Sequence, residues 1–311
     1  MTKAASVILA IIVTIAWMWK PGNVPRFDLS ETENGGAAYD YSFKKEISGD
    51  APKGICYRVL VPALCSAAQD LTPTTTREWL GKISDIPPLR DMDLDRDLMP
   101  AYAMVGFIAL LSFSTMGLLL GPLSLIMAWA AIGPMAGLGD PATLLAFSLA
   151  TWALMNGRRP AFWAAFAIAS LNRETAPLIL MFALFRGWEI KPLVVGAVLW
   201  IALRLSLYWA FCDNSAGMCW PLLERNLKLI QPISATTAIA ATAFFCVLAR
   251  GAMQSENWLR YSLVIGSSIL IVMACLWSRP ERLRTYLEML PVASVVLGCG
   301  IKSLLLGVRG A

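Results

Sequence analysis

The chain has 311 residues, of which 57% are hydrophobic and 15% charged, with a formal net charge of +5. About one quarter of the residues in soluble domains are charged, so this composition excludes an ordinary soluble protein. The small net positive charge does not indicate nucleic-acid binding, because lysine and arginine collect at the ends of membrane helices. The absence of histidine excludes Ser-His hydrolases and HExxH metalloproteases, and it leaves chemistry to Asp, Glu, Tyr, Lys and Arg.

Apolar runs recur along the chain, and several approach the 17–20 residues that a helix needs to cross a membrane. They are continuous rather than alternating, which predicts helices. We therefore predict an all-α, polytopic transmembrane helix bundle of about ten spans, forming a single integral membrane domain over residues 1–311. The expected spans are 4–19, 100–119, 120–136, 141–155, 160–171, 176–187, 192–211, 231–249, 261–277 and 286–307. The shortest runs suggest helices that cross incompletely or open onto a cavity.

The first span, residues 4–19, follows Lys3 and precedes no small-residue cleavage site, so it predicts a retained anchor with a cytoplasmic N-terminus. A slight excess of Lys and Arg in the short cytoplasmic segments agrees with this orientation. Residues 20–98, the one long polar region, then form a large first extracytoplasmic loop. Its segment Tyr57–Leu64 is too short to span and predicts an interfacial or re-entrant helix.

This loop carries carboxylates ahead of Tyr57-Arg58. Most are expected to be ordinary solvated side chains, but one of them near the membrane surface would suit a general base. Asp40, between Tyr39 and Tyr41, is our first candidate. The alternatives that remain open are Asp28, Glu31 and Glu33.

Three further positions place charge in or between apolar runs, where charge is expensive. Asp140, in Gly137-Leu-Gly-Asp140-Pro141, is typical of a helix N-cap, and such a cap can also hold a metal ion or a substrate hydroxyl. Arg173-Glu174 lies between two spans, where it either fixes two helices or binds and orients a phosphate. Arg204 lies inside an apolar run, where it either extends toward the interface or binds a phosphate. Glu288 and Lys302 are weaker candidates of the same kind.

The seven cysteines form no CxxC pair. Cys212 and Cys219 bracket a short polar loop, so a disulfide between them stays open if that loop is extracytoplasmic.

The order of three motifs resembles the GT-C superfamily of integral membrane glycosyltransferases, and its small bacterial members in particular. The motifs are Tyr57-Arg58-Val-Leu-Val-Pro62, then Asp140-Pro141 at the start of a span, then Asn172-Arg173-Glu174-Thr175 at the end of another. The pattern covers roughly residues 4–190. The resemblance implies that a sugar passes from a polyprenyl-phosphate donor, with inversion, to a glycan, lipid or protein acceptor on the extracytoplasmic face of the bacterial inner (plasma) membrane.

The resemblance also implies roles for individual residues. Asp40 becomes the base that deprotonates the acceptor. The cations available for the donor phosphate are Arg58, Arg173 and Arg204. Asp140 and Glu174 complete the expected substrate-binding residues, Glu174 as the residue that orients the phosphate-binding Arg173 and Asp140 as a ligand for a substrate hydroxyl. No cofactor is required by this chemistry; magnesium or manganese near Asp140 stays open, since metal sites without histidine are oxygen-ligated.

Two other classes remain as alternatives. A lipid or sugar-lipid transporter would explain the short spans and Arg204. An intramembrane aspartyl protease shares Gly137-Leu-Gly-Asp140 and Tyr39-Asp40, but its Tyr-Asp should lie in an apolar span, whereas residues 20–58 are polar. Its Pro-Ala-Leu should also follow the GxGD segment, whereas Pro62-Ala-Leu64 precedes it.

Overall fold

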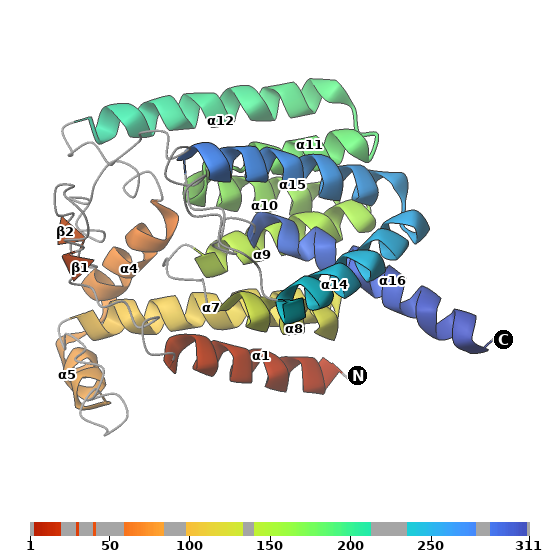
Figure 1. Cartoon of the computed structure of the whole chain (residues 1–311). Helices are drawn as coiled ribbons and strands as arrows, with labels where there is room; N and C mark the ends of the chain where they lie inside the picture. The colour runs from red at the N-terminus through yellow and green to blue at the C-terminus, as the bar shows by residue number, and fades with distance from the viewer. Residues whose placement is uncertain are drawn as a thin grey trace.

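The computed structural model describes residues 3–19, 29–30, 40–41, 59–83, 98–132, 140–212, 235–277 and 287–309 (Figure 1). Within these ranges the regular elements are helices joined by short turns, apart from one short antiparallel pairing, in which Leu29 faces Tyr41 and Ser30 faces Asp40. The elements are α1 (Lys3–Trp19), β1 (Leu29–Ser30), β2 (Asp40–Tyr41), α4 (Leu60–Leu71), α5 (Thr74–Ile83), α7 (Met99–Leu120), α8 (Pro122–Ile132), α9 (Asp140–Met155), α10 (Arg159–Asn172), α11 (Pro177–Phe185), α12 (Ile190–Ala210), α14 (Ala235–Gln254), α15 (Asn257–Trp277) and α16 (Leu290–Arg309).

Each apolar run expected to be a span coincides with a helix, so the all-α prediction is confirmed. Among the described residues, three helices are long and apolar enough to cross a membrane, namely Met99–Leu120, Ile190–Ala210 and Leu287–Leu306. By contrast, α10 has 14 residues and α11 has 9, or roughly 21 and 14 Å at 1.5 Å per residue. The number of crossings beyond these three stays a prediction.

Helix α9 is the centre of the bundle. It contacts α7, α10, α11 and α16, and twelve of its 16 residues are buried. A helix that is apolar on all sides is expected to be enclosed by others. Ala142, Ala146, Ala150 and Ala153 keep its surface narrow, which lets neighbouring helices approach closely, as is common among membrane helices.

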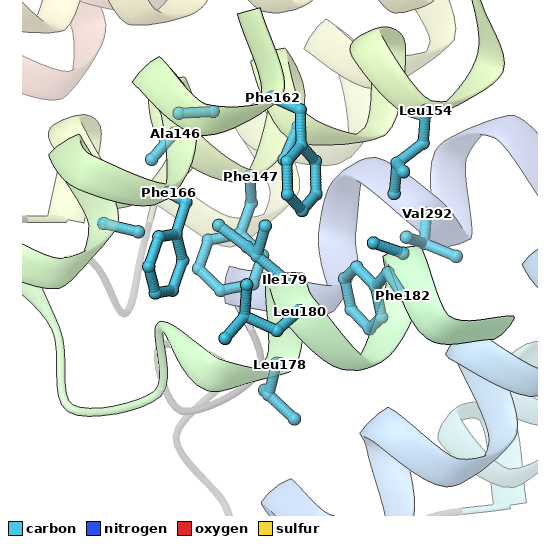
Figure 2. Packing of buried hydrophobic residues seen from close by; sticks show 14 of the residues in the cluster. Ala146, Phe147, Leu154, Phe162, Phe166, Leu178, Ile179, Leu180, Phe182 and Val292 are labelled. Atoms are coloured by element: carbon cyan, nitrogen blue, oxygen red, sulfur yellow. The ribbon is translucent and has the colours of Figure 1, made fainter. Parts of the chain in front are cut away.

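Aromatic rings fill the space between α9, α10 and α11. Figure 2 shows Phe147, Phe162, Phe166 and Phe182 grouped around Ile179. The rings of Phe147 and Phe182 meet edge to face, with their centroids 6.2 Å apart. This is a favoured geometry for aromatic pairs, and it joins α11 to the central helix although α11 is short.

Two tight turns end α9 and α11. At the first, Gly157 has a φ of +64° and Arg158 N–H donates to Ala153 O at 2.8 Å. At the second, Gly187 has a φ of +85° and Trp188 N–H donates to Ala183 O at 3.1 Å. Glycine is favoured where a helix ends in this left-handed conformation. In Figure 1 both turns lie toward the end of the bundle where the two termini lie, while α4, β1 and β2 lie at the other end.

Helices α14 and α16 cross in direct backbone contact. A Cβ atom on Gly251 would clash with the carbonyl oxygen of Val296, and one on Gly300 would clash with that of Val247. Nearby, Arg250 Nε donates to Ser303 Oγ at 3.1 Å. The two glycines therefore set the distance between these helices.

We predict that Gly251→Ala and Gly300→Ala each lower the free energy of unfolding by about 1–3 kcal/mol, because backbone atoms cannot make room for a methyl group. Gly298→Ala in α16 is the matched control. Its Cβ would meet only Leu123 Cδ2 at 3.9 Å, so the better helix propensity of alanine should leave stability unchanged or raised by up to about 1 kcal/mol. Thermal unfolding in detergent measures the stability of all three variants. Equal losses of stability at the three sites would contradict the close backbone contact between α14 and α16.

Candidate functional site

The first part of the site is an ion pair between the beginning of α9 and the end of α10. Arg173 Nη2 contacts Asp140 Oδ1, and the two residues are 7% and 0% exposed. Thr143 lies one turn after Asp140 on the same face of α9. Its Oγ1 accepts hydrogen bonds from Arg173 Nε at 2.9 Å and from Asn172 Nδ2 at 2.9 Å. A buried charge requires such partners.

The local sequence explains how these groups meet. Asp140-Pro141 begins α9, and proline suits the first turn because its missing N–H has no partner there. Arg173 ends α10 in an extended conformation, with its N–H donating to Ala169 O at 2.7 Å. Since α9 and α10 are antiparallel neighbours joined by the tight turn at Gly157, the start of one lies beside the end of the other.

Glu288 adds a second carboxylate from a distant part of the chain. It lies in the turn before α16, is 2% exposed, and its Oε1 accepts a hydrogen bond from Thr175 Oγ1 at 2.8 Å. Burial lowers the pKa of the Arg173 guanidinium, but Asp140, Glu288 and Glu174 together raise it by more, so its pKa lies above the ordinary value. Arg173 therefore stays a cation although it is buried.

Arg204 approaches the same end of the bundle from α12. Its Nη2 donates to Ser170 O of α10 at 2.8 Å, and its guanidinium lies 6.0 Å from the centre of the Trp200 ring. Glu174 is close enough to act electrostatically on both Arg173 and Arg204. The structure thus brings together four of the six residues that the sequence singled out, namely Asp140, Arg173, Glu174 and Arg204.

The other two lie in the first loop. Asp40 is the first residue of β2 and pairs with Ser30, but its side chain is outside the described part of the chain, and Arg58 is entirely outside it. The helix that follows Arg58, α4, contacts α7 and α10. Its Val61 and Cys65 share a buried cluster with Ala142 of α9 and Leu287. The helix that follows the Tyr57-Arg58 motif therefore packs in the same region as the start of α9.

Sequence reasoning gave Glu288 little weight and passed over Thr143. The spacing of Asp140 and Thr143 was a usable signal, because residues three apart share a helix face. Nothing local connects Glu288 to Thr175, which lies 113 residues earlier. The disulfide between Cys212 and Cys219 stays a prediction: Cys212 is exposed, and Cys219 lies outside the described residues.

The site holds cations and carboxylates but no ready-made metal cage. Across the described ranges, no group of three or more Cys, Asp or Glu side chains is placed to hold a metal ion. Magnesium or manganese binding stays a prediction. The arrangement provides the fixed guanidinium of Arg173 and a second guanidinium, that of Arg204, which contacts α10. It also provides carboxylate oxygens that can accept hydrogen bonds from hydroxyl groups.

The architecture defines a helical bundle with helices able to cross a membrane and a buried charged cluster at one end. No protein-family model, curated protein or solved structure matches the chain. Function is therefore inferred from the cluster itself.

We predict that Asp140→Asn and Arg173→Gln each lower the free energy of unfolding by about 3–5 kcal/mol, because each leaves a buried charge without its partner. The double variant should lose clearly less than the sum. The matched control is the exposed pair Arg186–Glu256, at 3.5 Å, where removing either partner should change stability by at most about 1 kcal/mol. A double-mutant cycle by denaturant unfolding in detergent tests this, and additive losses at Asp140 and Arg173 would contradict the coupling.

Proposed function

We propose that this protein is a membrane glycosyltransferase of the GT-C type, which transfers a sugar from a polyprenyl-phosphate donor to an acceptor on the extracytoplasmic face, with inversion at the anomeric carbon. The observation that carries the proposal is the buried cluster of Asp140, Thr143 and Arg173, joined by Glu174 and Arg204, at one end of an apolar helix bundle. A lipid-linked phosphate sugar presents a hydrophobic tail, an anion and hydroxyl groups, and this end of the bundle offers a partner for each.

In the proposed reaction, Asp40 removes the proton of the acceptor hydroxyl. The hydroxyl oxygen forms a bond to the anomeric carbon while the bond from that carbon to the phosphate oxygen breaks, and polyprenyl phosphate leaves with the electron pair. Arg58, Arg173 and Arg204 stabilise the negative charge on the phosphate. Asp140 and Thr143 hold Arg173 in place, so its guanidinium needs little reorganisation when the charge develops.

The location of the cluster favours this reading over the alternatives. A transporter is expected to place polar groups along a path through the membrane, whereas these residues gather where α9 begins and α10 ends. An aspartyl protease needs two neighbouring carboxylates that share a proton. Asp140 instead contacts a guanidinium, which is a poor setting for that chemistry.

The proposed orientation places the N-terminus and the turns at Gly157 and Gly187 in the cytoplasm of a bacterium. The first loop, α4, α5 and the charged cluster then face the extracytoplasmic side. Arg158, Arg159 and Arg186 follow or precede those two turns, which agrees with the preference of Lys and Arg for cytoplasmic segments.

This orientation predicts the labelling of two single cysteines in a variant without the seven native ones. A cysteine in place of Lys82, in α5, should react in intact cells with a thiol reagent that does not cross membranes. A cysteine in place of Asn156, in the turn after α9, should react only after the membrane is opened. Both positions have exposed side chains. The opposite pattern would reverse the orientation, and labelling of both in intact cells would contradict the alternating topology.

The enzyme assignment predicts that purified protein in lipid moves label from a radiolabelled undecaprenyl-phosphate sugar to an acceptor, and that Asp40→Asn abolishes this while the protein remains folded. The donor panel carries glucose, mannose, galactose or arabinose, and the acceptor is a lipid extract of bacterial membranes. Donor that binds but is never transferred by the wild-type protein would favour a transporter. Full activity of Asp40→Asn would show that Asp40 is not the base and that another carboxylate has this role.

Arg204→Gln should weaken donor binding on the order of 10- to 100-fold, the effect of losing one hydrogen bond to a charged group. Arg204 tests phosphate binding more cleanly than Arg173, whose replacement also leaves Asp140 buried without its cation. Arg186→Gln, a cation at the opposite end of the bundle, is the matched control and should bind donor normally. The measurement is equilibrium binding of the donor. Equal donor affinities of the wild-type protein and Arg204→Gln would show that Arg204 does not bind the phosphate and has a structural role.

A further inference from the structure

Glu288 has a buried carboxylate oxygen with no hydrogen-bond partner in the part of the chain that the structure describes. Its side chain is 2% exposed, and Oε1 accepts a hydrogen bond from Thr175 Oγ1 at 2.8 Å. Oε2 is also buried, and it has no hydrogen-bond partner among the described residues. Buried carboxylate oxygens are almost always hydrogen-bonded, so an exception calls for an explanation.

The contact with Thr175 does not by itself explain a carboxylate. That contact ties the turn before α16 to the turn between α10 and α11, and a single neutral acceptor would suffice for it. A buried charge is expensive unless its remaining lone pairs are satisfied. The second oxygen is therefore better explained by a donor that is present only when a ligand is bound.

The surroundings indicate which kind of donor this is. Arg173 and Asp140 both act electrostatically on Glu288, so its carboxylate lies at the charged cluster. On α10, one turn before Arg173, Ser170 Oγ is likewise buried with no hydrogen-bond partner in the described ranges, and its carbonyl is the acceptor for Arg204. Unused oxygens thus lie on elements that flank the two guanidiniums. A ligand with an anion for the guanidiniums and hydroxyl groups for the oxygens fits this arrangement.

We propose that Glu288 is a specificity-determining residue whose Oε2 accepts a hydrogen bond from one hydroxyl group of the donor sugar. This inference rests on the proposed function and deepens it, because it assigns a sugar contact to a residue outside the motif pattern. Thr175 holds the carboxylate in place through Oε1, and Oε2 faces the sugar that is attached to the phosphate. A site that hydrogen-bonds a substrate hydroxyl rejects analogues that lack it, because the buried acceptor is then left without a partner.

The test is a binding profile with modified donors. Undecaprenyl-phosphate glucose, mannose, galactose and arabinose are first ranked by affinity for the wild-type protein without acceptor. For the tightest of them, each sugar hydroxyl is replaced in turn by fluorine, which preserves size but cannot donate a hydrogen bond. At one position the wild-type protein should lose 10-fold or more in affinity, the effect of losing a hydrogen bond to a charged group.

Glu288→Gln should bind the unmodified donor at least 10-fold more weakly and lose less than 3-fold further on fluorination at that same position. The amide retains an acceptor for Thr175, so the link between the two turns is preserved. Glu256→Gln is the matched control. This carboxylate lies far from the cluster, against Arg186 and Trp258, and the variant should keep the wild-type profile.

Each other outcome decides against the inference. If fluorination at each position changes the affinity of the wild-type protein and of Glu288→Gln by the same factor, Glu288 only links the two turns. The proposed function is then unaffected. If the wild-type protein tolerates fluorine at every position within 3-fold, no hydroxyl donates to Oε2, and this holds even if the variant does not fold. If none of the four donors binds the wild-type protein, the proposed function fails and the inference fails with it.

Discussion

The ion pair between Asp140 and Arg173 is the constraint on which the rest of this structure depends. Both charges are buried in an apolar bundle, where neither is tolerated without the other. Their contact fixes where α9 begins relative to where α10 ends. The turn that carries Glu174 and Thr175 follows directly, and Thr175 in turn holds Glu288 at the start of α16. One pair of charges therefore positions three helices and the polar groups between them.

The two ends of the bundle are built differently. At one end, glycine-terminated turns join α9 to α10 and α11 to α12, and the charged side chains beside them, Arg158, Arg159 and Arg186, are exposed. At the other end, α9 begins and α10 ends beside buried charged side chains, and α4 contacts α10. Because α9 is enclosed on all sides, its first residue is buried rather than exposed to water. The enclosure of α9 is thus the physical reason that its charged first residue, Asp140, lies inside an apolar protein.

The same contacts serve both a structural and a catalytic interpretation. An arginine held by a carboxylate and a hydroxyl ties two helices together, and it is also a rigid cation that needs no rearrangement to meet an anion. What separates the interpretations is the rest of the neighbourhood. A structural link between two helices requires neither a second guanidinium at Arg204 nor a buried carboxylate oxygen at Glu288 that has no hydrogen-bond partner among the described residues.

The sequence by itself determined the helices and the first members of the site. Continuous apolar runs can satisfy the hydrogen bonds of their backbone in lipid only as helices. Because a charged residue in or next to such a run is unfavourable unless it has a role, the sequence singled out Asp140, Arg173 and Arg204. Only the tertiary structure decided which charges meet, that Thr143 and Glu288 join them, and that Gly251 and Gly300 bring α14 against α16. The reason is that these helices are apolar on every side, so no periodicity identifies the face that meets a neighbour. Their pairing depends on shape and on rare polar contacts between residues far apart in the chain.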